Sequence, residues 1–217
     1  MADSFKIIDE SFDSKQTESY RLLIQLKADS LAFSVFYPYK NKFIVLAEDF
    51  FNGRPLNDVL HSHPELKATY KEVKVCILTQ QNCFTIVPNP LFDQEQLEHY
   101  LLLSNTVTSD AALLYNPMRF SQTVCVHAAP LNWINTIKTA FPKARVYHHS
   151  TAFIDGLIFQ YLNLSGKNAF INISDSYFEM VVLENGRLLF YNKFATQNTN
   201  DLIYYALFTF EQLNMRA

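Results

Sequence analysis

Two turns of this chain carry polar side chains that could bind an anion or a metal ion. They are Gln25 and Lys27 in the first turn, and Asn172, Ser174, Asp175 and Ser176 in the second. A lysine attracts anions, while amide and carboxylate oxygens are ligands that Mg²⁺ accepts. Two interpretations of the six residues are open. They form a degenerate nucleotide site, or they are turn residues that satisfy local hydrogen bonds, and we expect the second.

Histidine pairs suggest metal binding, but their spacing does not favour it. His61 and His63 lie two residues apart at the end of a predicted helix, where such side chains do not share a face. His148 and His149 lie between a predicted strand and a helix, where capping is expected. His127 falls in an apolar run that predicts core. We therefore expect no metal site, and no Ser/His/Asp or Cys/His arrangement predicts a catalytic residue.

The cysteines and glycines limit which kinds of functional site the chain can form. The three cysteines, Cys76, Cys83 and Cys125, show no C-x-x-C spacing, which predicts buried reduced thiols rather than a zinc site or a disulfide framework. The chain has only 4 glycines, whereas an average chain of this length would have about fifteen. No two of them are close enough to form a glycine-rich phosphate loop.

Composition predicts an ordered globular protein. Of 217 residues, 49% are hydrophobic and 15% aromatic, which excludes intrinsic disorder. The net charge of −3 argues against nucleic-acid binding. No apolar run is long enough to span a bilayer, and the polar N-terminus does not resemble a signal peptide, so we expect a cytoplasmic protein without a membrane span.

The elements that position the two turns occur twice. Residues 22–50 and 169–194 each predict a strand, a polar turn, a second strand, a second turn and a third strand, with a helical segment afterwards. Leu22, Ile24 and Leu26 alternate onto one strand face. Asn185-Gly186 predicts a type I′ hairpin turn. This repeat predicts two similar half-molecules with a cleft between them.

The segments outside the two repeats predict alternating strands and helices. Strands are predicted at 72–79, 83–87, 110–116, 124–129 and 144–147, and helices near 56–68, 94–104, 150–162, after Pro130 and after Asn198. From this order we predict three parts. Residues 1–18 form a tail or edge segment, residues 19–120 a first lobe with an inserted strand–helix region, and residues 121–217 a second lobe.

This order of elements resembles the actin-like ATPase superfamily, with a closer likeness to the pilus protein PilM and the division protein FtsA. The stretches that carry it are the opening meander, VCVHAAPLNWINTIKTAFPKARVYHHSTAFIDG at 124–156 and INISDSYFEMVVLENGRLLFYNKF at 171–194. The chain also resembles a bacterial domain-of-unknown-function family with this fold. The resemblance implies a duplicated RNase H-like α/β fold, with mixed sheets and flanking helices. It also implies that the second lobe, residues 121–217, is incomplete and lacks the usual C-terminal elements of the superfamily.

The residues that the superfamily uses for phosphate binding are replaced here. Each phosphate turn of the superfamily carries Asp-x-Gly, whereas this chain has Gln25-Leu26-Lys27 and Asn172-Ile173-Ser174. The resemblance implies a left-handed backbone at the glycine position, where Ser174 would be strained. Asp175 adds a negative charge to the turn that should hold phosphate.

We therefore predict a non-catalytic actin-like-fold protein that acts as a protein-interaction scaffold, with no cofactor. A protein partner or a homo-oligomer is expected, and no nucleic acid. The alternative is a divergent ATP-binding ATPase or small-molecule kinase that holds a metal with Asn172 and Asp175. An enzyme is the less favoured of the two, because both phosphate turns are altered.

Overall fold

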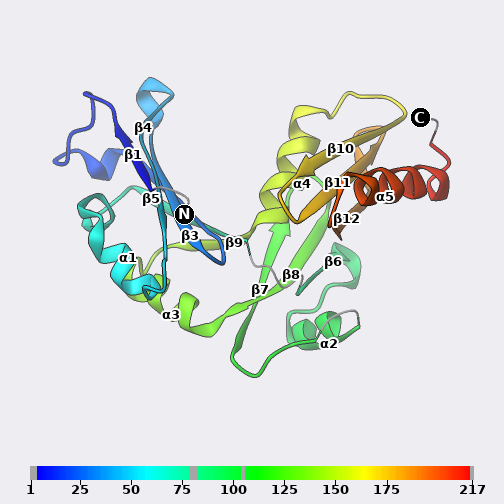
Figure 1. The fold of residues 1–217 in the computed structure, drawn as a ribbon, viewed down its shortest axis with the longest axis horizontal. Coiled ribbons are helices and arrows are strands. Elements are labelled where there is room, and N and C mark those ends of the chain that lie inside the picture. The colour runs from blue at the N-terminus through cyan, green and yellow to red at the C-terminus, as the bar shows by residue number, and fades with distance from the viewer. Residues whose placement is uncertain (1–3, 79–82, 104–105, 216–217) are drawn as a thin grey trace. The chain divides into compact units, whose positions relative to one another are not determined.

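The computed structural model describes residues 4–78, 83–103 and 106–215, and the chain divides into two compact units (Figure 1). The first unit comprises Met1–Pro117 and Val124–His149, and the second comprises Met118–Thr123 and Ser150–Ala217. The sequence analysis assigns residues 121–217 to the second lobe. The segment Val124–His149 instead packs in the first unit, because its strands pair with strands there.

A six-stranded sheet forms the main part of the first unit. Its spatial order is β1 (Phe5–Ile8), β4 (Lys42–Phe50), β3 (Ser30–Tyr37), β2 (Arg21–Leu26), β5 (Glu72–Ile77) and β9 (Arg145–His148). The strands β1, β4, β3 and β2 pair antiparallel, whereas β5 runs parallel to β2 and β9 runs parallel to β5. The predicted N-terminal edge segment thus contributes the edge strand β1.

The apolar positions of this sheet explain its core. Leu22, Ile24 and Leu26 are buried on one face of β2, as their alternation predicts. They pack with buried residues of β3, β4 and β5 and with α1 (Leu56–Ser62) and α3 (Leu131–Ala140). The helix predicted over 56–68 is interrupted. Because Pro64 lacks an amide hydrogen and fixes its backbone, α1 ends at Ser62 and a 3₁₀ turn, Pro64–Lys67, follows.

A second, three-stranded sheet has the order β6 (Phe84–Pro88), β8 (Thr123–Pro130) and β7 (Ala111–Met118). The apolar run of β8 occupies its centre, with Val124 and Val126 buried in a separate small core. The helix α2 (Leu97–Leu102) covers this core, and Asp93 caps the 3₁₀ turn before it by accepting from Glu95 N at 2.9 Å. The predicted ends at residues 79 and 104 lie outside the described residues.

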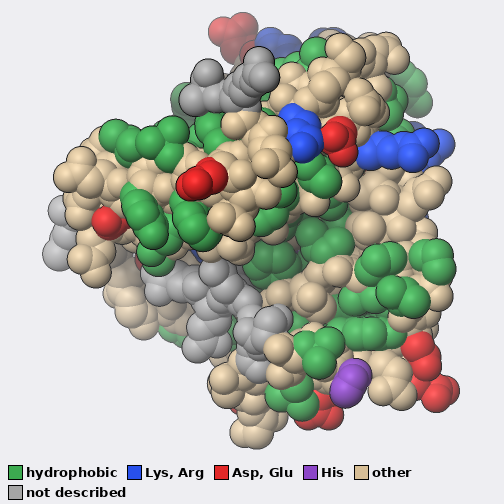
Figure 2. Space-filling model, turned by 90° about the vertical axis from the view of Figure 1, so that its right-hand side faces the viewer, with side chains coloured by type: hydrophobic (Ala, Val, Ile, Leu, Met, Phe, Trp, Pro, Cys, Tyr) green, Lys and Arg blue, Asp and Glu red, His purple; other side chains and the backbone are tan. Residues whose placement is uncertain are grey.

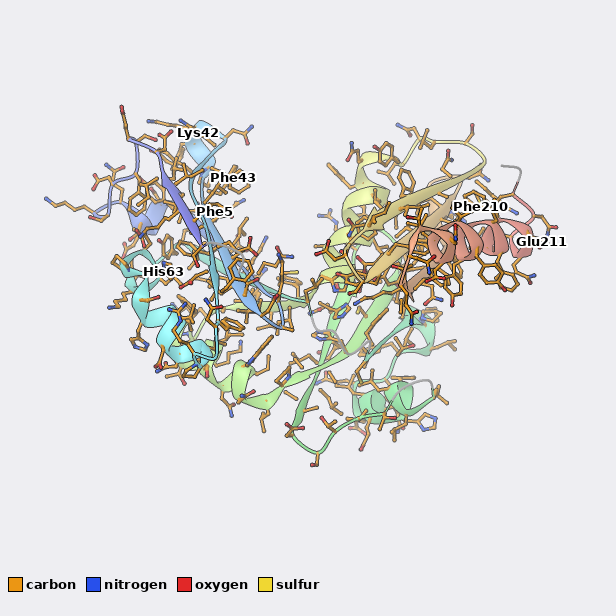
Figure 3. The ribbon with its side chains drawn as sticks, viewed as in Figure 1. Phe5, Lys42, Phe43, His63, Phe210 and Glu211 are labelled. Atoms are coloured by element: carbon orange, nitrogen blue, oxygen red, sulfur yellow. The ribbon has the colours of Figure 1, made fainter. Side chains whose placement is uncertain are left out.

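The second unit contains the sheet β10 (Lys167–Ile173), β11 (Tyr177–Glu184) and β12 (Arg187–Ala195), which are antiparallel, and the helices α4 (His149–Gln160) and α5 (Thr199–Gln212). Asn198 and Asp201 form a capping box at the start of α5. Phe210 packs against the core formed by β11 and α5, whereas Glu211, the next residue along the helix, is exposed (Figure 3). No described helix is long and apolar enough to cross a bilayer.

The predicted repeat is present in the hydrogen bonds of the two meanders. Lys27 N donates to Ser30 O at 2.9 Å in the first turn, and Ser174 N donates to Tyr177 O at 2.8 Å in the second. The residue after each third strand donates back to the turn in the same way. These bonds join Phe51 N to Asp29 O and Thr196 N to Ser176 O, at 2.8 and 2.9 Å. The equivalence places Gln25 with Asn172, and Lys27 with Ser174.

Candidate functional site

In the first unit, a carboxylate of the same sheet binds Lys27. Lys27 Nζ lies 2.9 Å from Glu48 Oε1, and Ser30 Oγ donates to the same oxygen at 3.1 Å. The hydrogen bond from Lys27 is the main reason why the pKa of the Glu48 carboxyl is lowered. Gln25 is exposed on the neighbouring strand. The cation of this turn, which could attract a phosphate, is therefore already paired.

The ion pair predicts the effect of removing its cation. Lys27→Met should lower the free energy of unfolding by only about 0.5–1 kcal/mol, since the pair is partly exposed. It should also raise the pKa of Glu48 toward its ordinary value, because the strongest hydrogen bond to the carboxylate is lost. Urea denaturation and an NMR titration of the Glu48 carboxyl measure both effects. The exposed Lys143→Met serves as the control, and an unchanged Glu48 pKa in Lys27→Met would contradict the pairing.

In the second unit, Asn172 is also bound by a carboxylate. Asn172 Nδ2 donates to Glu179 Oε2 at 3.1 Å, and Tyr191 Oη donates to Oε1 at 2.5 Å. Glu179 is buried, and Lys193 lies opposite it on β12. Burial lowers the pKa of Lys193, whereas the charge of Glu179 acts to raise it. The sequence analysis missed Glu179. An acidic residue in the interior of the apolar strand YFEMVVLE, rather than at its end, is the signal that could have indicated it.

The other residues of the second turn do not form a phosphate cradle within this unit. The Ser174 amide already donates to Tyr177 O, while Asp175 and Ser176 are exposed. The left-handed backbone expected at Ser174 is not present. Among the described residues, positive φ angles occur at Asn41, Asn52, Gln122, Asn185, Asn214 and three glycines. Ser174 is therefore unstrained, because a hairpin turn closed by its own amide does not require φ > 0 there.

The six predicted site residues thus fall into two groups. Gln25 and Lys27 lie in the first unit and Asn172, Ser174, Asp175 and Ser176 in the second. Within each unit the polar group best suited to a ligand is held by a glutamate of the same sheet.

A cavity of about 360 Å³ opens beside the first turn, entirely within the first unit. Ala28 of the β2–β3 turn lines it, together with Ala129 at the end of β8 and Trp133 of α3. The strand β8 ends in small residues, which leaves this space unfilled. The backbone around it is fixed, since Ala128 N donates to Cys83 O and Leu131 N donates to Asp110 O, both at 2.9 Å.

The chemistry of the cavity favours binding over reaction. Cys83 lines it, and burial raises the pKa of this thiol, so the reactive thiolate is disfavoured at neutral pH. Among the described residues that line it, Asp110 is the only charged one. A carboxylate repels phosphate and attracts a cation. The cavity therefore suits an apolar group next to a positive charge.

Three histidines meet elsewhere in the first unit. The ring centroids of His127 and His148 lie 5.2 Å apart, and those of His148 and His149 lie 4.5 Å apart. Burial, with a smaller contribution from His149, lowers the pKa of His127 to about 4. No group of three or more His, Cys, Asp or Glu residues in the described ranges is arranged to hold a metal ion. These rings therefore belong to the core. Sequence spacing alone did not predict that His127 would contact His148.

Comparison with known proteins identifies the family. A family model described as "Protein of unknown function (DUF3822)" matches residues 9–217. The chain belongs to this family. None of the curated proteins matches this DUF3822 protein significantly.

Solved structures identify the fold of the DUF3822 protein. A Bacteroides thetaiotaomicron protein with actin-like ATPase fold and unknown function is 25% identical, with a TM-score of 0.86, over 94% of this chain and 81% of that one. A chain of a PilM–PilN type IV pilus biogenesis complex is 11% identical, with a TM-score of 0.53, over 89% of this chain and 66% of that one. The predicted fold class is therefore confirmed, and the PilM likeness shows the fold alone.

Proposed function

We propose that this DUF3822 protein is a non-catalytic, cytoplasmic scaffold, and that its first unit binds a short segment of a partner protein. The observation that carries this proposal is the pairing of Lys27 with Glu48 at 2.9 Å, which occupies the cation of the first turn. Because Glu48 already neutralises Lys27, this turn has no free positive charge to neutralise a triphosphate. The PilM relative was solved with PilN, and a protein partner for the present chain is our inference.

The cavity beside the first turn supports the choice of ligand. Its volume is that of a small-ligand pocket, so it accepts anchoring side chains of a peptide rather than a folded domain. The small apolar side chains of Ala28 and Ala129 fit an aliphatic or aromatic anchor. Asp110 fits a lysine or arginine beside that anchor. We therefore propose an apolar segment with an adjacent basic residue as the ligand.

Trp133 provides the test, because it lines the cavity and is the only tryptophan of the chain. A library of short peptides with an apolar anchor next to lysine should contain sequences that shift the Trp133 emission, whereas Mg-ATP should not. Asp110→Asn should weaken such a peptide by about tenfold, since it removes one charge-assisted contact. Thr108→Phe should occlude the cavity, and the exposed Thr139→Phe on α3 is the matched control.

Two results would contradict the proposal. One is equal peptide affinity for Thr108→Phe and the parent chain, which would move the site away from the cavity. The other is micromolar affinity for Mg-ATP in calorimetry. ATP turnover that disappears in Asp175→Ala would favour the alternative, a divergent ATPase or kinase.

A further inference from the structure

Three basic side chains of the six-stranded sheet share a single carboxylate. Glu72 Oε2 lies 3.4 Å from Arg21 Nε, and Glu72 Oε1 lies 3.5 Å from Lys74 Nζ and 4.0 Å from Arg145 Nη1. Three positive charges and one negative charge leave a local net charge of +2, whereas the whole chain carries −3. We call Arg21, Glu72, Lys74 and Arg145 the basic cluster.

The strand register explains why these residues meet. Arg21 of β2 lies opposite Glu72 of β5, and Lys74 of β5 lies opposite Arg145 of β9. Because side chains alternate along a strand, all four lie on the face of the sheet opposite to the buried Leu22. The three strands run parallel, and Arg21, Glu72 and Arg145 are the first residues of their strands. The cluster therefore lies at the N-terminal ends of β2, β5 and β9.

This position separates the basic cluster from the polar turns and from the cavity. Arg21 begins β2, whereas the turn with Lys27 and the cavity wall at Ala28 follow the last residue of that strand. A strand of this length spans roughly 17–20 Å. The cluster is therefore a separate feature of the first unit, at the opposite end of β2.

The cations of the cluster have unused hydrogen-bonding capacity. Charge-assisted N–H···O bonds measure about 2.7–2.9 Å, which is shorter than all three distances to Glu72. Arg21 Nε is buried and has no hydrogen-bond partner in the part of the chain that the structure describes. The side chains of Arg21, Lys74 and Arg145 are 42%, 41% and 71% exposed, so an anion has access to them.

The basic cluster is small, which limits the kind of anion that fits it. On the same face, Leu23 lies opposite Lys74 and Phe36 lies opposite Arg21, and both are half-buried apolar residues. The face of the molecule in Figure 2 likewise shows few Lys and Arg side chains among hydrophobic and uncharged ones. A nucleic acid needs basic side chains spread over a longer path. A single anionic group therefore fits the cluster better than a polyanion.

We propose that the basic cluster binds a doubly charged oxyanion, and that a phosphate monoester is the group that fits it best. The charge of such a group, about −1.5 to −2 at neutral pH, matches the net charge of the cluster. The planar guanidinium groups of Arg21 and Arg145 suit paired N–H bonds to two phosphate oxygens, and Lys74 adds a compact positive charge. A carboxylate carries one charge and would neutralise only half of the cluster.

An NMR titration of the whole chain with inorganic phosphate at pH 7.5 and constant ionic strength tests the proposal. The signals of Arg21, Lys74 and Arg145 should shift with a Kd on the order of 1 mM, as expected for a few charge-assisted hydrogen bonds. Acetate should bind at least about tenfold more weakly, since it carries half the charge.

A blocked tripeptide, Gly-phosphoserine-Gly, distinguishes two sources of the phosphate group. Equal affinity for the tripeptide and for inorganic phosphate would support recognition of the phosphate group alone. Tighter binding of the tripeptide would support recognition of a phosphorylated protein. The unphosphorylated tripeptide should not bind in either case, because it has no anionic group.

Matched variants locate the contact. Arg145→Gln should weaken phosphate binding by about tenfold, because it removes one guanidinium group. Glu72→Gln should instead strengthen it by about tenfold, because the competing carboxylate is lost and the net charge of the cluster rises to about +3. Both variants should fold, since the ion pairs are partly exposed. Arg187→Gln, which removes the same charge from an exposed position on β12, should leave the affinity unchanged.

Four results would overturn the proposal. They are unshifted cluster signals at about 20 mM phosphate, which excludes even millimolar affinity, equal affinity for acetate and phosphate, equal losses of affinity in Arg145→Gln and Arg187→Gln, and weaker phosphate binding by Glu72→Gln. None of these measurements involves the cavity of the first unit or the emission of Trp133. This inference and the proposed function therefore succeed or fail separately.

Discussion

Gly186→Ala is expected to lower the free energy of unfolding by at least about 2 kcal/mol, through backbone strain and a steric clash. Gly186 has φ +73°, where an L-residue other than glycine is disfavoured. A Cβ at this position would clash with Leu162 O and lie 3.0 Å from Leu162 C. Both contacts are with backbone, which cannot rotate away as a side chain could. The loop after α4 or the β11–β12 turn must therefore move.

Denaturant unfolding followed by far-UV circular dichroism measures this loss, with Gly156→Ala as the matched control. Gly156 lies within α4, and no described atom comes within 4 Å of a Cβ built there. Alanine at that position should be neutral or should stabilise the protein by up to about 1 kcal/mol, because it favours helix. If Gly186→Ala unfolded at the same denaturant concentration as the parent chain, the close approach of Leu162 would be refuted.

The same glycine shows which parts of the fold the sequence could predict. Asn185-Gly186 predicts a tight hairpin from local backbone preferences alone, and both residues have the positive φ angles that such a turn requires. The contact with Leu162 joins residues that are distant in sequence, so no local pattern indicates it. Likewise, alternation predicted the strand β2, but it could not show that β8 pairs with β6 and β7 while β9 pairs with β5.

In the candidate site, too, the sequence predicted the local turn residues but not their distant partners. The sequence identified Lys27 and Asn172 as polar residues at equivalent turns, and the matching turn hydrogen bonds confirm the repeat. Their partners could not be predicted, because Glu48 lies 21 residues from Lys27 and meets it only through the strand register. The cavity was also missed, since Cys83, Asp110 and Trp133 come from separate elements. Whether any of these residues binds a ligand stays a prediction.

Acidification from pH 7 to pH 4 is expected to destabilise the first unit by an amount on the order of 3 kcal/mol through His127 alone. Burial, followed by the charge of His149, lowers the pKa of His127 to about 4 in the folded chain. An unfolded chain has the ordinary histidine pKa of about 6.5. The unfolded state therefore binds the proton first as the pH falls. The stabilisation by the neutral ring is complete above about pH 6.5 and is lost between that value and about pH 4.

His127→Phe tests this directly, because neither ring nitrogen of His127 has a hydrogen-bond partner in the part of the chain that the structure describes. The aromatic ring contact with His148 can be kept, while the titration is removed. The variant should lose about 3 kcal/mol less than the parent chain between pH 7 and pH 4, since it has no site for that proton. His99→Phe, which changes an exposed histidine of α2, should follow the parent.

An NMR titration of the His127 ring separates this cause from other effects of acid. Its midpoint should fall near pH 4 while the protein is still folded, because the buried ring has no bulk water to solvate its charge. A midpoint near pH 6.5 in the folded protein would mean that the ring is hydrated, and the difference in stability between the two pH values could then not arise from His127.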